Sequence, residues 1–172
     1  MNTRDVERGK DAVGSTEQLR AWLIDHGQLG ADEAVQPDGL ARALAVREGI
    51  RALGRANNGE PMDIAAVAAL NRAAASVPVT VAVEPLAGDG AWALHPGAAG
   101  VDGFVGRILG TLAAAMADGS WSRVKACRND TCRWLFFDQS RNRSGTWCTM
   151  ALCGSRMKAR AYRARQRESA GA

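Results

Sequence analysis

The chain has 172 residues, of which 47% are apolar and 5% are aromatic. This length suits one medium domain, or a body of about 120 residues with a small appendage. We find no run of about 18 apolar residues and no apolar stretch behind the charged start MNTRDVERGKD, so we expect neither a membrane span nor a secretory signal. We therefore expect a protein of the reducing cytoplasm, where paired cysteines bind metal more often than they form disulfides.

Charge divides the chain into two parts. Residues 1–120 hold 10 basic and 15 acidic side chains, a net charge of −5, whereas residues 121–172 hold 12 basic and 3 acidic ones, a net charge of +9. A basic module behind an acidic body favours an anionic partner, most often nucleic acid, although a solvated basic helix with no partner has the same composition. We predict a body at 1–120 and a basic module at 121–172.

Three helices are predicted in the first half of the body. A capping box at residues 15–18 opens the first helix. Pro37 opens a second helix, which residues 57–59 stop, and Asp63 opens a third. The chain leaves no room for a strand ahead of the first helix, so we expect none there.

The second half of the body is predicted to hold one small β-hairpin and a fourth helix. The β-branched run 79–83 and the segment 91–95 are the expected strands, with a turn at 88–90 between them. The fourth helix is expected over 101–117. The fold class predicted for the body is therefore mainly α with one small β-hairpin.

The strongest signal is the spacing of four cysteines. Each pair follows the pattern Cys-x4-Cys, and 15 residues separate the pairs. Two knuckles joined by a hairpin are typical of a tetrahedral zinc site. We expect the hairpin to run out along 133–137 and back at 146–147, and a helix to follow from 155 to 167. This order predicts a treble-clef-like finger that ends in a basic helix. The predicted ligands are Cys127, Cys132, Cys148 and Cys153.

The predicted ion is one structural Zn²⁺ per chain. So small a module cannot bury enough apolar surface to fold alone, and metal binding would supply the deficit. Four thiolates leave no open coordination position, so we do not expect catalysis there. Two disulfides, or an iron–sulfur or redox site, are the alternatives. Three basic residues beside the ligands could neutralise the thiolates: Lys125, Arg128 and Arg133.

The basic residues of the module are candidates for contact with nucleic acid. Helical spacing puts four arginines on one face of the last helix, next to a face of Met157, Ala161 and Ala164 that we expect to pack on the body. Two further arginines lie at the expected hairpin tip. Trp134, Trp147 and the two phenylalanines between them could stack on bases, but a small core is the stronger interpretation. The predicted contact residues are Arg141, Arg143, Arg156, Lys158, Arg160, Arg163 and Arg167.

The module resembles the CGNR zinc finger. The shared pattern is Cys-x4-Cys, an aromatic strand reaching an Asp, a Ser-Arg-Asn turn, Trp-Cys, and a final Cys-Gly-x-Arg ahead of a basic helix. Ser155 stands where the family has Asn; since Ser can also cap a helix, we expect a small effect. The matching positions are Cys127, Cys132, Trp134, Phe136, Asp138, Ser140, Arg141, Asn142, Trp147, Cys148, Met150, Cys153, Gly154 and Arg156.

The body resembles the ABATE domain, a family of stress-induced transcription regulators. Asn2-Thr3 is similar to the end of its opening F-x-N-T strand, and Leu19, Trp22 and Leu23 to its L-x-x-W-L helix. Arg47-Glu48 is similar to its L-R-E helix. The opening strand itself is expected to be absent here, either because this member lacks it or because the start of the chain is assigned too late.

The two resemblances together imply a bacterial, cytoplasmic, nucleoid-associated regulator that binds double-stranded DNA through the zinc module. An RNA-binding module, and a protein-interaction adaptor with zinc as a staple, are the alternatives. A homodimer and a small-molecule effector of the body are further expectations. Trp22 and Trp92 are candidate pocket walls, although a place in the core is the stronger interpretation of both. An enzyme is not expected: His26 and His95 are isolated and read as structural, and Asp138 beside a turn is expected to accept backbone donors.

Overall fold

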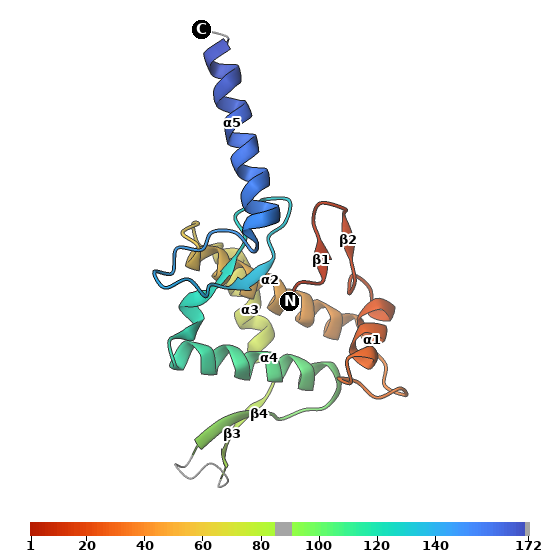
Figure 1. Cartoon of the computed structure of the whole chain (residues 1–172). Coiled ribbons are helices and arrows are strands. Elements are labelled where there is room, and N and C mark those ends of the chain that lie inside the picture. The colour runs from red at the N-terminus through yellow and green to blue at the C-terminus, as the bar shows by residue number, and fades with distance from the viewer. Residues whose placement is uncertain (85–90, 171–172) are drawn as a thin grey trace.

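The computed structural model describes residues 1–84 and 91–170, except the side chains of residues 83, 84, 91–93, 168 and 170. Its centre is the long helix α2 (Pro37–Asn57), which packs against α3 (Ile64–Ala75) and α4 (Gly100–Ala117), with α1 (Thr16–Asp25) at one end (Figure 1). Leu23, Val46 and Val105 are fully buried where these helices meet. The four helices predicted for the body are confirmed.

The helix starts follow the predicted signals. Ser15 caps α1 by accepting a hydrogen bond from the Gln18 backbone N–H, and Asp63 caps α3 by accepting one from Ala66. The Gln18 side chain reaches back to the Gly14 backbone N–H (3.0 Å), one residue earlier than in the standard capping box. Pro37 is the first residue of α2, where its missing N–H costs no hydrogen bond.

The expectation that no strand precedes the first helix is wrong. Strands β1 (Arg4–Asp5) and β2 (Lys10–Asp11) form a short antiparallel hairpin, visible beside α1 in Figure 1. Gly9 has a φ of +64°, a conformation that glycine adopts without strain. Charged residues and two-residue strands carry no apolar alternation, so sequence patterning gave no sign of this hairpin.

The predicted body hairpin is confirmed. Strands β3 (Val79–Glu84) and β4 (Ala91–Pro96) pair antiparallel, with Val79 opposite Pro96, and β4 lies against α4. A Cβ at Gly106 would lie 2.9 Å from the Pro96 Cβ, so the missing side chain allows this close approach. The predicted turn at 88–90 and the side chain of Trp92 lie outside the described residues.

Helix α4 is relevant to the expectation that the chain has no membrane span. In the described part of the chain it is the one helix whose length and composition would suffice to cross a membrane. Its Val101 and Val105 belong to the core formed with α1 and α2. The apolar residues of α4 therefore serve to pack this helix against α1 and α2.

The C-terminal third begins directly after α4. A 3-10 turn η2 (Ser120–Arg123) leads into β5 (Val124–Ala126), which pairs with β6 (Leu135–Phe137). A turn of π-helix η3 (Met150–Gly154) runs into α5 (Ser155–Ala170), which projects away from the body (Figure 1).

Two expectations for this third are corrected. The aromatic strand pairs with β5, ahead of the first cysteine, and not with residues 146–147; the segment between is instead folded around a buried ion pair described below. The face of Met157, Ala161 and Ala164 does not pack on the body: Met157 is half-buried, and both alanines are exposed. Helix α5 leaves the body too steeply for that contact (Figure 1).

Candidate metal centre and nucleic-acid interface

The two cysteine pairs converge on one point. Their four sulfurs lie within 4.8 Å of one another, with 3.6 Å between Cys132 and Cys148 and 3.7 Å between Cys148 and Cys153. All four are free thiols, and these separations are far above the roughly 2.05 Å of a disulfide. Four sulfurs at about 2.3 Å from a central zinc would be about 3.8 Å apart in a tetrahedron. The geometry therefore fits one structural zinc ion and excludes the two-disulfide alternative for this conformation.

The electrostatics of two of the thiols, Cys132 and Cys148, also favour a bound cation. Burial raises the pKa of Cys132 to about 11, and burial raises the pKa of Cys148 still further. Four neighbouring sulfurs in a partly dry site resist carrying negative charge together, and a divalent cation is what allows them to do so. The donor set, all sulfur and closed, suits a structural role for zinc.

Asn129 organises the first knuckle and was missed at the sequence level. Its side chain accepts from the Thr131 backbone N–H and hydroxyl, its carbonyl accepts from Cys132 and Arg133 N–H groups, and its Nδ2 lies 3.5 Å from Cys153 Sγ. Burial alone raises the pKa of Cys153, but hydrogen bonds, first from Asn129, outweigh it and lower that pKa. The Asn in Cys-Arg-Asn-Asp was the available signal, because turn-forming amides hold metal knuckles in this way.

A buried ion pair holds the loop between β6 and Cys148. Lys125 Nζ donates to Asp138 Oδ2 (2.7 Å), and both side chains are nearly inaccessible, at 6% and 3% exposed. Asp138 also accepts from the backbone N–H groups of Ser140 and Gly145, which confirms its predicted use as a backbone acceptor. The hydrogen bond from Lys125 is the main reason that the Asp138 pKa lies far below its ordinary value.

The predicted neutralisation of the thiolates by basic neighbours is not what the structure shows. Lys125 pairs with Asp138, and Arg133 pairs with Asp130 (2.8 Å). Arg128 donates its guanidinium to the Asn58 backbone carbonyl. Each of these cations therefore has a structural partner elsewhere.

Two asparagines at the end of α2 join the module to the body. Asn57 Nδ2 donates to the carbonyls of Trp121 (2.8 Å) and Val124 (2.9 Å). Asn58 Nδ2 donates to those of Ala126 (2.7 Å) and Thr146 (2.9 Å). The sequence suggested only a helix stop at these positions. Through these hydrogen bonds the two asparagines also hold β5 and the second cysteine pair against α2.

Two known families match this chain. The description "putative stress-induced transcription regulator" (ABATE) matches residues 1–119, and the CGNR zinc finger matches residues 123–166. This chain belongs to the ABATE family and carries a CGNR zinc finger. No curated protein matches the chain. The resemblance stated from the motifs is confirmed, as is one structural zinc as the cofactor.

The ABATE motifs quoted from the sequence meet in space. Arg47 Nη1 donates to Thr3 Oγ1 (3.0 Å) and to Asp11 (2.8 Å), and Arg47 Nε donates to Glu48 (2.9 Å). Asn2 donates to the Leu135 carbonyl (2.9 Å) and accepts from its N–H (2.8 Å). No strand is formed at Asn2, but its side chain makes with the Leu135 backbone the two hydrogen bonds that a neighbouring strand would make.

The CGNR motif departure has a visible consequence. The Ser155 hydroxyl donates to the Met150 carbonyl (3.1 Å), one of the acceptors inside η3, whereas a helix cap would accept a backbone N–H. Gly154, the second residue of the motif, is a glycine because the chain packs closely there: a Cβ would lie 2.4 Å from Met150 Sδ. The motif therefore shapes the passage from metal site to helix.

The basic residues of the CGNR finger are placed in two groups. Those on α5 are exposed, and Arg156 also pairs with Glu7 of the β1–β2 hairpin (2.9 Å). A cavity of about 580 Å³ lies between α5, Glu7 and the knuckle, and it is lined by the predicted face of four arginines. Arg141 and Arg143 lie on the loop after β6, where Arg143 also contacts the Ser122 hydroxyl (3.1 Å). The residues placed on α5 are Arg156, Lys158, Arg160, Arg163 and Arg167.

The aromatic residues of the finger divide in burial. Trp147 and Phe136 are half-buried, as a small core requires, whereas Trp134 and Phe137 are 44% and 51% exposed. In the body, His26 stacks on Trp22 with 3.9 Å between ring centroids, and its Nδ1 lies 2.7 Å from the Trp22 carbonyl. These contacts fit the structural interpretation of His26.

Proposed function

We propose that this protein is a transcription regulator of the bacterial cytoplasm that binds double-stranded DNA with helix α5 of its CGNR finger. The observation that carries the proposal is the exposure of α5: its arginines project into solvent from a helix that the zinc site holds at its base. Like charges at helical spacing repel each other, and phosphate groups would relieve that repulsion. The family description supports the same role.

The mode of binding that we infer is a rigid basic helix on a treble-clef-like scaffold. The knuckle at Cys127–Cys132 and the helix after Cys153 support that assignment of the finger. Helix α5 is about 24 Å long at 1.5 Å per residue, enough to lie along a major groove. Arg141 and Arg143 would add a second phosphate contact, and we assign no catalytic role to the chain.

The test is a titration of zinc-loaded protein with duplex DNA over a range of salt. Contact with about five phosphates predicts a log–log slope of about −4 to −5. Changing Arg160 and Arg163 together to Glu should abolish binding at unchanged zinc content. Arg20→Glu with Arg72→Glu, at arginines of α1 and α3 outside the finger, is the matched charge control. Retained binding by the double variant would contradict the proposal.

Two outcomes would redirect the proposal. Preference for structured RNA over duplex DNA at matched salt would indicate the RNA-binding alternative. Zinc-loaded protein that binds no nucleic acid at low salt would favour the adaptor. A homodimer is part of the proposal only as the usual route to reading two half-sites, and sedimentation with and without DNA would measure it.

A further inference from the structure

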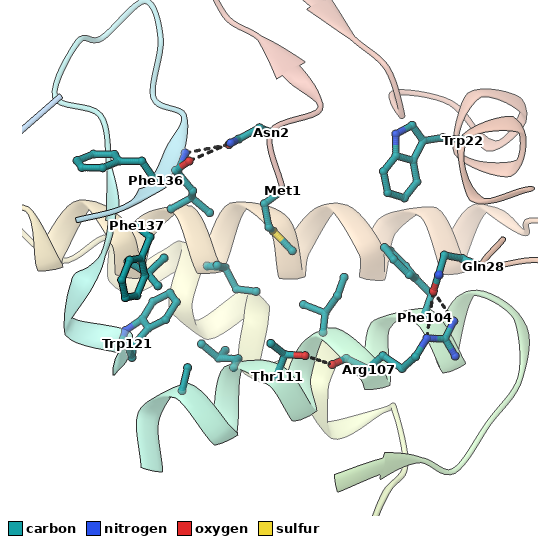
Figure 2. A pocket seen from close by; sticks show the side chains of 16 residues that line it. Met1, Asn2, Trp22, Gln28, Phe104, Arg107, Thr111, Trp121, Phe136 and Phe137 are labelled. Carbon is teal, nitrogen blue, oxygen red and sulfur yellow. Dashed lines mark hydrogen bonds between the residues drawn. The ribbon is translucent and has the colours of Figure 1, made fainter. Parts of the chain in front are cut away.

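A second cavity, of about 600 Å³, lies between the ABATE body and the CGNR finger, and we call it the body–finger groove (Figure 2). Its floor comes from α2 and α4, one end comes from α1, and β6 closes the other end. The volume lies within the range of about 300–1,000 Å³ typical of small-molecule sites. Its apolar lining includes Trp22, Ile50, Phe104, Ile108, Leu112, Trp121, Leu135 and Phe136.

The groove exposes aromatic and aliphatic side chains that are only partly buried. Trp22 and Phe104 line the end near α1 and pack edge to face, with 5.9 Å between their ring centroids. Trp121 and Phe136 line the end near the finger (Figure 2). Burial of contiguous exposed apolar surface of this kind by a ligand is favourable. The groove therefore favours an occupant with an apolar body.

One charged side chain makes one end of the groove positively charged. Arg107 lies at its α1 end and donates through Nε (3.1 Å) and Nη2 (2.9 Å) to Gln28 Oε1, a neutral acceptor. No acidic side chain is among the residues that line the groove, and no carboxylate pairs with Arg107 in the described part of the chain. Thr111 lies one helical turn further along the same wall (Figure 2). The groove is thus apolar along its length and cationic at one end.

We propose that the body–finger groove binds an amphiphilic carboxylic acid, with its apolar body along α4 and its carboxylate on Arg107. A carboxylate can accept two parallel hydrogen bonds from a guanidinium, a stronger arrangement than the present pair of bonds to an amide oxygen. The Gln28 amide is held by the two bonds from Arg107 to its Oε1 and by one bond from its own Nε2 to the His26 carbonyl (3.2 Å). A carboxylate on Arg107 would replace only the two bonds to Oε1, and the bond to His26 could remain.

The position of the groove links its occupant to the finger. Leu135 and Phe136 belong to β6, which is fastened to the body by Asn2 and lies next to the strand that precedes Cys127. A ligand in contact with both α4 and β6 stabilises the docked arrangement of the finger, and coupling of this kind is reciprocal. This regulatory consequence rests on the DNA-binding function proposed above, whereas ligand binding itself does not.

The first experiment uses the zinc-loaded full chain with 1-anilinonaphthalene-8-sulfonate as a fluorescent reporter, displaced by decanoate or by uncharged 1-decanol. We expect saturable binding of one reporter per chain and displacement by decanoate at about tenfold lower concentration than by decanol, the effect of one charge-assisted contact. In Arg107→Gln the two competitors should become equal. Arg72→Gln, at an exposed arginine of α3 outside the groove, is the matched control.

Occlusion of the groove gives an independent measurement. Ala115→Trp places a large ring inside the groove and should remove reporter binding at unchanged helicity and zinc content. Failure of the reporter to saturate, or a decanoate preference that survives Arg107→Gln, would overturn the proposal. A DNA titration with and without decanoate then tests the coupling: ligand binding without any DNA binding would refute the proposed function and leave the ligand site standing.

Discussion

The arginines of α2 and those of α5 show opposite uses of the same side chain. Arg47 and Arg51 in α2 are 6% and 5% exposed, and each lies against a carboxylate of the body. The α5 arginines are exposed, and among the described side chains only Arg156 has an acidic partner. A buried cation needs a fixed partner, whereas an exposed one is hydrated and available. Burial and pairing, more than the number of basic residues, thus separate arginines that hold the fold from arginines available to a ligand.

The largest expected effect concerns the zinc site at the base of α5. Cys127→Ser should lower the zinc content and unfold the finger, because structural zinc contributes on the order of 10 kcal/mol to such modules. Hydrogen exchange should then be fast for amides of residues 124–137 and remain slow in α2 and α3. Slow exchange at 124–137 in zinc-free protein would show that docking on α2 alone folds the finger.

Arg47 should matter far more to stability than its counterparts in α5. Arg47→Ala leaves Asp11 without its cation, whereas Glu48 keeps Arg51, and the change is expected to cost about 3 kcal/mol. Arg163→Ala should change the free energy of unfolding by less than about 0.5 kcal/mol. Urea unfolding of the two variants measures the difference; equal losses would remove the distinction between the two sets of arginines.

The Asp11–Arg47 pair also predicts a pH dependence. Burial raises the Asp11 pKa, but the hydrogen bond and charge of Arg47, with the Val13 N–H, outweigh it and lower the pKa overall. A lowered folded-state pKa contributes stability that is present above the unfolded value of about 3.9 and is lost as pH falls through the folded value. The difference in unfolding free energy between wild type and Asp11→Asn should therefore stay constant from pH 7 to pH 5 and shrink below about pH 4.

Zinc release in acid is expected to destabilise wild type and Asp11→Asn alike. The difference in unfolding free energy between the two therefore reports on the Asp11–Arg47 pair. Asp32→Asn is a suitable control, because Asp32 is exposed and has no ion pair in the described part of the chain. A difference that grows towards acid would contradict the assignment.

The smallest expected effect concerns the contact between the two regions. Glu7 pairs with Arg156, and both side chains are more than half exposed, so the pair contributes little stability. Glu7→Gln frees Arg156 and removes a negative charge from the basic face, and should raise DNA affinity about twofold to fivefold at low salt. The gain should be smaller in Arg156→Gln, where only the removed negative charge contributes; an undiminished gain there would show that release of Arg156 has no part in it.

Signals local to a helix end or to a metal ligand set were readable from the sequence. Ser15, Pro37 and Asp63 mark helix starts through their own backbone chemistry, and the cysteine spacing indicates closure around one ion. Contacts between distant segments were not readable. The pairing of β6 with β5 and the clasp of Asn57 and Asn58 depend on which backbone groups the fold brings together, and no residue pattern encodes that.

The candidate site shows the same limit. Helical spacing grouped the α5 arginines on one face, but it could not show that Met157 and the alanines beside it would stay off the body. It also could not show that Lys125 would prefer Asp138 to the thiolates, since the choice follows from burial of both partners. The division into a body at 1–120 and a module at 121–172 stays a prediction.

The asparagine clasp at the end of α2 has a consequence for how such proteins diversify. Its acceptors are the backbone carbonyls of Trp121, Val124, Ala126 and Thr146, which every amino acid supplies alike. Apart from Arg128, which bonds the Asn58 carbonyl, the finger's side chains can therefore change without loosening this clasp, provided that the two amides remain. A chimaera with a foreign CGNR finger should keep a single unfolding transition, and one that also lacks Asn57 and Asn58 should show two.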